Sequence, residues 1–207
     1  MVIKKLVVGP LECNCYLIVD EHSKATLLVD PGDEPDEIID VINENNLKIK
    51  YIICTHAHFD HVGAVSDIKQ KTGAPIIIHH DEQEIYAGTR EQAALWGFEL
   101  GEFPVPDILV SEGDMLEIGS LKFKIIHTPG HTPGSICLLG KEILITGDTI
   151  FAGSVGRTDL HGGDMLQLKN SFKRLISLSE EIKILPGHGP ETTVGREKKE
   201  NFFNISS

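Results

Sequence analysis

Residues 55–61 read Thr-His-Ala-His-Phe-Asp-His and follow the apolar run Tyr51-Ile52-Ile53-Cys54. In a strand, side chains alternate between faces, so His61 would point away from the three ligands before it. In a helix, His56 and His58 would diverge. Only a loop that leaves the end of a strand directs all four polar side chains to one point. Imidazoles with a carboxylate suit Zn²⁺ or Fe, so the stretch predicts a metal site rather than a histidine-rich turn.

Apolar strands that end in a polar residue and a turn recur along the chain. Strands are expected at 2–8, 14–20, 25–30, 50–54, 74–79, 114–118, 121–127, 135–140, 142–146 and 182–185. Helices are expected from Pro35, over 62–71, within 81–97, after the N-cap Asp164 and over 194–203. This alternation predicts an α/β layered protein, formed as one domain over 1–207, with its site where strands end.

Three further polar residues stand just past predicted strands, each beside Gly or Pro: His131, Asp148 and His188. Taken singly, each histidine is more often a surface or hydrogen-bonded residue than a ligand, and Asp148 is equally suited to cap a turn. Together with the first cluster they give seven ligands, which divide into two sites sharing one bridging carboxylate.

His56-x-His58-x-Asp60-His61, followed by His131, Gly147-Asp148 and Gly187-His188, resembles the metallo-β-lactamase superfamily over nearly the whole chain. The resemblance implies an αββα sandwich, with two mixed β-sheets packed between outer helices. It also implies that the first metal is held by His56, His58 and His131. The second would be held by Asp60, His61 and His188, with Asp148 bridging. Class B β-lactamases usually lack an aspartate at the bridging position, so Asp148 favours the other hydrolases.

Two divalent cations are the expected cofactor, zinc first, with iron or manganese as alternatives. Against two carboxylates and one hydroxide they leave the centre about one charge positive, which favours a substrate with an anionic or polarised carbonyl end. A metal lowers the pKa of bound water to about 7, so hydroxide is available to attack. Asp60 is the candidate catalytic residue that orients this nucleophile. Hydrolysis of an activated acyl compound is the direct expectation.

The segment Phe151-Ala152-Gly153-Ser154-Val155-Gly156-Arg157-Thr158-Asp159 resembles glyoxalase II-like hydrolases and the related persulfide dioxygenases. The resemblance implies hydrolysis of an anionic thioester such as S-lactoylglutathione, with Arg157 binding substrate. The alternative role of Arg157 is a structural ion pair with Asp159, which stands where longer glyoxalase II enzymes tend to have tyrosine. The chain also stops before their C-terminal helical domain, so it is closer to the short glyoxalase II-like proteins.

Two other functions of the same fold are alternatives. A persulfide dioxygenase with one iron would use His56, His131 and Asp148, and the ligand list does not separate it from a hydrolase. A nuclease is disfavoured because the net charge is -12 and no basic, aromatic tract is present. The same charge argues against a membrane surface, and no apolar run has transmembrane length. The sequence offers no export signal and four cysteines without disulfide spacing, which predicts a reduced, cytoplasmic protein.

Two secondary expectations concern the surroundings of the centre. Asp30, before Pro31-Gly32, would hold the histidine loop by hydrogen bonds, a role compatible with forming the turn. Residues 88–106, which contain Trp96, Phe98 and Phe103, are predicted either as a mobile flap over the site or as a small satellite core. The remaining histidines are interpreted as non-ligands, and Cys54 as a buried, unreactive thiol.

Overall fold

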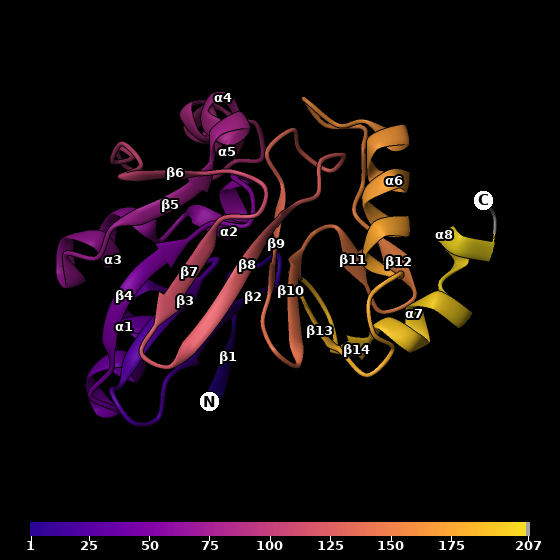
Figure 1. The fold of residues 1–207 in the computed structure, drawn as a ribbon. Coiled ribbons are helices and arrows are strands. Elements are labelled where there is room, and N and C mark those ends of the chain that lie inside the picture. Colours follow the sequence, from indigo (N-terminus) through magenta and orange to yellow (C-terminus); the bar gives the residue numbers. More distant parts are fainter. Residues whose placement is uncertain (206–207) are drawn as a thin grey trace.

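Two six-stranded mixed sheets form the centre of the protein, and the computed structural model describes residues 1–205 (Figure 1). The first sheet has the order β1 (Val2–Val8), β2 (Cys13–Val19), β3 (Ala25–Val29), β4 (Lys48–Ile53), β5 (Ile76–His79) and β6 (Ile108–Val110). The second has the order β14 (Thr192–Thr193), β13 (Lys183–Pro186), β10 (Ile143–Gly147), β9 (Ile136–Leu139), β8 (Leu121–His127) and β7 (Met115–Ile118).

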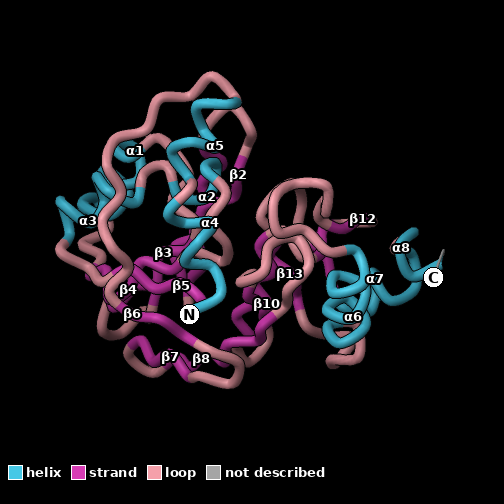
Figure 2. Tube along the Cα trace, turned by 90° about the horizontal axis from the view of Figure 1, so that it is seen from above, coloured by secondary structure: helices cyan, strands magenta, loops and turns pink. Residues whose placement is uncertain are grey.

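Helices cover the outer face of each sheet, as the views in Figures 1 and 2 agree. The first sheet carries α1 (Pro35–Glu44), α2 (Phe59–Val62), α3 (Val65–Thr72), the 3₁₀ turn η1 (His80–Glu82), α4 (Gln83–Ala87) and α5 (Thr89–Leu95). The second carries α6 (Met165–Leu175), α7 (Val194–Glu200) and α8 (Phe202–Ile205), with a small hairpin of β11 (Ile150–Phe151) and β12 (Ser154–Val155). This is the αββα sandwich that the resemblance implied.

Alternation of side chains along the strands divides the core into three layers. In β2, for example, Leu17 packs toward α1 and α3, whereas Ile18 packs between the sheets. The central layer takes residues from both sheets, including Phe123 of β8, which is 1% exposed. A third layer lies between the second sheet and α6, where Phe172 is buried. Burying each such side chain contributes about 1.5–3 kcal/mol, so the strand ends are held on a rigid double sheet.

Most predicted elements lie where expected, and one of the local differences has a steric cause. The single helix predicted over 62–71 is wrong at its start, because Gly63 and Ala64 separate α2 from α3. At Gly32 a Cβ would lie 1.7 Å from the Asp60 carbonyl oxygen, and at Gly63 a Cβ would lie 2.3 Å from the Gly32 carbonyl oxygen. The turn after β3 therefore packs closely against α2, the short helix that contains Asp60 and His61. The short strand β6 was not predicted, and its Ile108 and Leu109 are exposed at the sheet edge.

All four cysteines are free and buried, as expected, including Cys54, which is 1% exposed. Burial raises the pKa of the Cys54 thiol well above its ordinary value, so the thiol stays protonated and is not a nucleophile. Within residues 1–205, no helix is both long and apolar enough to cross a bilayer. The prediction of one domain over 1–207 stays a prediction.

Candidate metal centre

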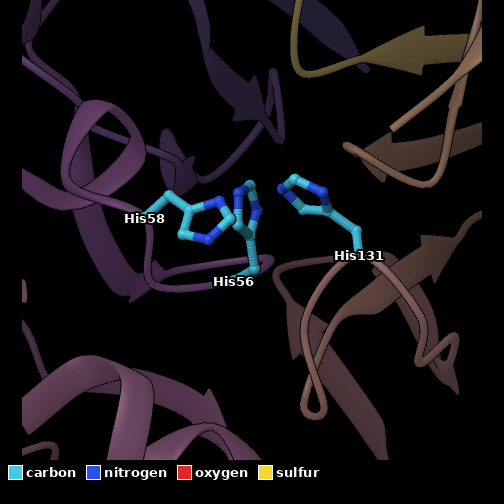
Figure 3. A group of neighbouring side chains, drawn as sticks. All are labelled: His56, His58 and His131. Carbon is cyan, nitrogen blue, oxygen red and sulfur yellow. The ribbon is translucent and has the colours of Figure 1, made fainter. Parts of the chain in front are cut away.

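Three buried imidazoles converge where the two sheets meet (Figure 3). His56 and His58 leave the loop after β4, and His131 comes from the loop between β8 and β9. The His56 ring centroid lies 4.9 Å from that of His58 and 4.7 Å from that of His131, and the last two are 4.5 Å apart. The rings are steeply inclined to one another rather than stacked. One ligand atom from each lies within 4.8 Å of the others.

A second group lies beside the first and consists of Asp60, His61 and His188. Asp60 Oδ2 is 3.2 Å from His188 Nε2 and 3.7 Å from His61 Nε2. The two Nε2 atoms are 3.1 Å apart. Asp60 and His61 lie in the short helix α2, which turns them toward the loop after β13 that carries His188.

Asp148 stands between the two groups, just past the end of β10. Its Oδ1 is 3.4 Å from His61 Nε2. Its Oδ2 is 3.6 Å from His131 Nε2 and 3.7 Å from His188 Nε2. One carboxylate therefore reaches ligands of both groups. All seven residues that were predicted as ligands are brought together.

The donor atoms at this centre fit a metal, because several have no other partner. His56 Nε2, His58 Nε2, His131 Nε2 and Asp148 Oδ1 are buried without a hydrogen bond. An unsatisfied buried polar atom costs about 1–3 kcal/mol, so four at one point need an explanation. Burial, reinforced by the neighbouring His131, lowers the pKa of His58 to about 3, so its imidazole is neutral. Neutral imidazoles and carboxylates are the ligands that zinc and iron take.

Hydrogen bonds on the far side of the rings fix the tautomer that metal binding needs. His131 Nδ1 donates to the Arg157 carbonyl at 2.7 Å, and His188 Nδ1 donates to the Glu12 carbonyl at 3.2 Å. A carbonyl only accepts, so the proton is on Nδ1 and the lone pair of Nε2 faces the centre. His61 Nδ1 likewise donates to Asp30 Oδ2 at 3.1 Å.

Besides its bond to His61, Asp30 also holds the loop that carries His56 and His58. Its Oδ1 accepts from the Thr55 amide at 2.7 Å, and its Oδ2 accepts from the Thr55 hydroxyl, also at 2.7 Å. Thr55 Oγ1 in turn lies 3.2 Å from His56 Nδ1. The buried carboxylate of Asp30 thus reaches both groups of ligands through its own bonds and one intermediate hydroxyl, as expected for a residue that orients metal ligands.

Glu82 is a contributor that the sequence did not indicate. Its carboxylate is 0% exposed and accepts three hydrogen bonds of 2.8 Å, from the Ala57 amide, the Thr132 hydroxyl and the Gly134 amide. Ala57 lies between His56 and His58, and Thr132 follows His131, so one side chain ties the two loops of the first group together. Burial raises the pKa of Glu82 to about 7 despite these donors. Its only sequence signal is its place shortly after a strand.

Arg157 forms the ion pair with Asp159 that was one of its two expected roles. Arg157 Nε and Nη2 donate to Asp159 Oδ1 and Oδ2, each at 2.7 Å. The side chains are 51% and 67% exposed. Arg157 also lines the cavity beside the metal ligands, so the pair stands at the mouth of the site.

The segment 88–106 contributes a wall to the same cavity. Phe59 packs against Phe98, with centroids 5.0 Å apart, and lies 6.3 Å from the Trp96 ring. Phe103 instead packs edge-on against Tyr86, away from the metal ligands. The aromatic residues therefore make packing contacts of the kind expected for a satellite core. The prediction of a mobile flap stays a prediction.

A family model described as the metallo-beta-lactamase superfamily matches residues 8–188. The chain belongs to this superfamily. The match contains β2 to β13 and all seven residues of the centre. This metallo-β-lactamase superfamily protein is a metal-dependent hydrolase, and its fold implies divalent metal ions.

Relatives within the superfamily cover nearly the whole chain. Hydroxyacylglutathione hydrolase GloC of Haemophilus influenzae is 37% identical over 213 residues, covering 100% of each chain. The crystal structure of TTHA1623 in a di-iron-bound form matches with a TM-score of 0.90 at 39% identity, covering 97% of this chain and 99% of that one. The structure of ETHE1 from Myxococcus xanthus matches with a TM-score of 0.83 at 28% identity, covering 97% and 83%.

The end of β13 leaves no room for a side chain beside the centre of this superfamily member. At Gly187 a Cβ would lie 2.2 Å from Asp148 Oδ1 and 2.7 Å from His61 Cε1. We therefore expect Gly187→Ala to displace Asp148 and to lower bound metal and hydrolytic activity by about tenfold or more. Metal analysis of the purified variant checks this. Gly101→Ala is the matched control, because a Cβ there meets nothing within 4 Å. Unchanged metal content in Gly187→Ala would contradict the prediction.

A separate group of histidines lies outside the seven-residue centre. His79 and His80 form a possible ligand group with Asp81, and His79 stacks on His127 with centroids 3.9 Å apart. Burial, with the nearby His127 and His80, lowers the pKa of His79 to about 4. Its Nδ1 accepts from the Asp81 amide at 3.2 Å, which also favours the neutral ring.

The lowered pKa of His79 predicts that this residue makes the folded protein less stable as the pH falls. Between about pH 6.5 and pH 4 the unfolded chain binds a proton at His79 that the folded protein does not, so wild-type stability falls with acid. His79→Gln removes this loss. When the pH is lowered from 7.5 to 5, we expect the free energy of unfolding of the variant to rise relative to that of wild type by about 1–2 kcal/mol. Urea unfolding checks this, with the exposed His22→Gln as control. Parallel pH curves would refute it.

Proposed function

We propose that this protein is a binuclear thioester hydrolase of the short glyoxalase II-like branch. One divalent ion would be held by His56, His58 and His131. The other would be held by Asp60, His61 and His188, with Asp148 shared. Zinc is the first candidate, with iron or manganese as alternatives. The observation that carries the proposal is Asp148 lying within 3.7 Å of ligand nitrogens from both groups, among buried atoms without partners.

When bound, such ions supply Lewis-acid polarisation of a carbonyl and lower the pKa of a water. The chain supplies the orientation. Two cations at this centre would keep the adjoining Asp60 carboxylate ionised. Asp60 is 16% exposed and lines the cavity. An ionised carboxylate there accepts a hydrogen bond from an attacking water and directs it toward the acyl carbon.

The relative from Haemophilus influenzae supports the thioester assignment, because its name is hydroxyacylglutathione hydrolase and it aligns over 100% of the chain. A small thioester also suits the size of the cavity beside the ligands, about 420 Å³. We extend the proposal to a protein that works in the cytoplasm, since its four buried cysteines are free thiols.

A mononuclear iron persulfide dioxygenase is the second candidate. It is supported by the match to ETHE1 from Myxococcus xanthus at 28% identity, and by His56, His131 and Asp148 lying at one centre. The two candidates differ in metal content and in co-substrate, so they are separable by measurement.

The deciding experiment compares two reactions of the metal-replete protein. We expect hydrolysis of S-lactoylglutathione or of a neutral lactoyl thioester, with about two metal ions per chain. Oxygen uptake with a persulfide is measured on the same sample. One iron per chain with persulfide-dependent oxygen uptake, and no thioester hydrolysis, would replace the proposal with the dioxygenase.

A further inference from the structure

One side of the cavity beside the metal centre is an apolar wall. It is formed by residues from four separate parts of the chain: Leu11, Phe59, Trp96, and Phe151 with Val155 and Leu160. Leu11 is 39% and Trp96 50% exposed, so large apolar groups stand open to solvent at the entrance. Apolar surface that lines a cavity next to reactive groups is what binds the apolar part of a ligand.

Positive charge at the entrance is confined to Arg157, the only Lys or Arg among the described residues lining this cavity. Its guanidinium donates from Nε and Nη2 to the two carboxylate oxygens of Asp159, each at 2.7 Å. The backbone of Arg157 is also fixed, because its carbonyl accepts from His131 Nδ1. The one arginine or lysine among the described residues that line the cavity is therefore neutralised by a residue two positions along.

We propose that the thiol arm of the substrate is apolar and uncharged, that it lies along this wall, and that Asp159 sets the preference by occupying Arg157. The inference rests on the proposed thioester hydrolysis and names its substrate class. It concerns the arm alone, since the expected anionic or polarised carbonyl end is the part that meets the metal centre.

The physical basis is competition for one guanidinium. A carboxylate on the arm has to displace Asp159, which is tethered two residues away and already in bidentate geometry. Without displacement it faces a neutral ion pair in a protein of net charge -12. An alkyl arm needs no counter-charge and gains from covering the exposed apolar surface.

Trp96 makes binding measurable without catalysis, because it is the only tryptophan of the chain and lines the cavity. We would titrate metal-replete protein with two thioethers that lack a scissile acyl bond, S-hexylglutathione and S-hexyl-N-acetylcysteamine. Trp96 fluorescence gives a Kd for each. Wild type is expected to bind the neutral thioether at least about tenfold more tightly. In Asp159→Asn the glutathione thioether should tighten by about threefold to tenfold, with the neutral one within about twofold of wild type.

Glu112→Gln is the matched control. Glu112 is also an exposed carboxylate that pairs with both terminal nitrogens of an arginine, Arg174, but it does not line this cavity. The Glu112→Gln substitution changes the net charge by the same amount as Asp159→Asn and should leave both Kd values unchanged. Three results would overturn the inference. The ratio of the two Kd values could be the same in wild type and Asp159→Asn, or wild type could bind the glutathione thioether more tightly than the neutral one. The third is no fluorescence change with either compound.

The proposed function is tested separately with lactoyl thioesters of the same two thiols. Hydrolysis of neither, with the expected Kd pattern intact, would reject thioester hydrolysis and leave the binding preference standing. Hydrolysis of both with equal kcat/KM in wild type would support the function and reject the preference. Failure of one proposal is thereby distinguished from failure of the other.

Discussion

Asp148→Asn is expected to leave the protein folded while lowering its metal content from about two ions to one or fewer and its hydrolytic activity by at least about 100-fold. The Asp148 carboxylate approaches nitrogens of both ligand groups, at 3.4–3.7 Å. The amide removes the negative charge and places a donor against Nε2 atoms or against cations. Elemental analysis together with thioester hydrolysis measures both effects.

Asp81→Asn is the matched control for this prediction. Asp81 is a 48% exposed carboxylate in the separate His79 and His80 group, so its loss tests whether metal occupancy belongs to the seven-residue centre. We expect Asp81→Asn to retain metal and activity. Full metal content and full activity in Asp148→Asn would rule out a shared bridging carboxylate.

Glu82→Ala is expected to lower the free energy of unfolding by about 2–4 kcal/mol, a large effect for a residue that touches no metal ligand. Truncation leaves the buried amides of Ala57 and Gly134 without an acceptor, and it leaves the Thr132 hydroxyl with Ser135 Oγ as its partner. It also releases the tie between the loops that carry His58 and His131, so metal affinity should fall. Urea unfolding of metal-replete protein, followed by metal competition with a chelator, measures the two effects.

Glu84→Ala provides the comparison, because Glu84 is two residues further on and 86% exposed. Its unfolding free energy should stay within about 0.5 kcal/mol of wild type. Glu82→Gln keeps one acceptor oxygen and should fall between wild type and Glu82→Ala. If Glu82→Ala matched Glu84→Ala, the buried carboxylate would not connect the two loops.

The seven residues of the centre were predictable because each follows an apolar strand and stands beside a turn. Strand ends are local features, and in layered α/β folds they gather at one edge. The resemblance added which of the ligands hold the first metal and which hold the second. The structure then brings His131, Asp148 and His188 to the first cluster, from positions far along the chain. Composition and spacing suffice for such a site because the chemistry restricts the residue types.

Contacts that depend on packing between distant segments were not predictable in the same way. Glu82 follows His79-His80-Asp81 in a polar stretch and has the sequence appearance of a surface acid, yet it is 0% exposed. The break before α3 depends on how closely Gly32 and Gly63 approach, which no local propensity encodes. The choice between two roles for Arg157 depended on the loop backbone that places Asp159 within reach.

The candidate metal ligands and the residues proposed to determine the substrate arm lie at different depths in the protein. His56 and His61 are 1% and 0% exposed on a double sheet, whereas Trp96, Arg157 and Asp159 stand at the surface. Exposed positions tolerate substitution with little loss of stability, while buried ones do not. Mutational drift at the entrance can therefore alter which compounds are accepted while the reactive core is inherited intact. Such a division gives one scaffold a low barrier to acquiring new substrates over evolutionary time.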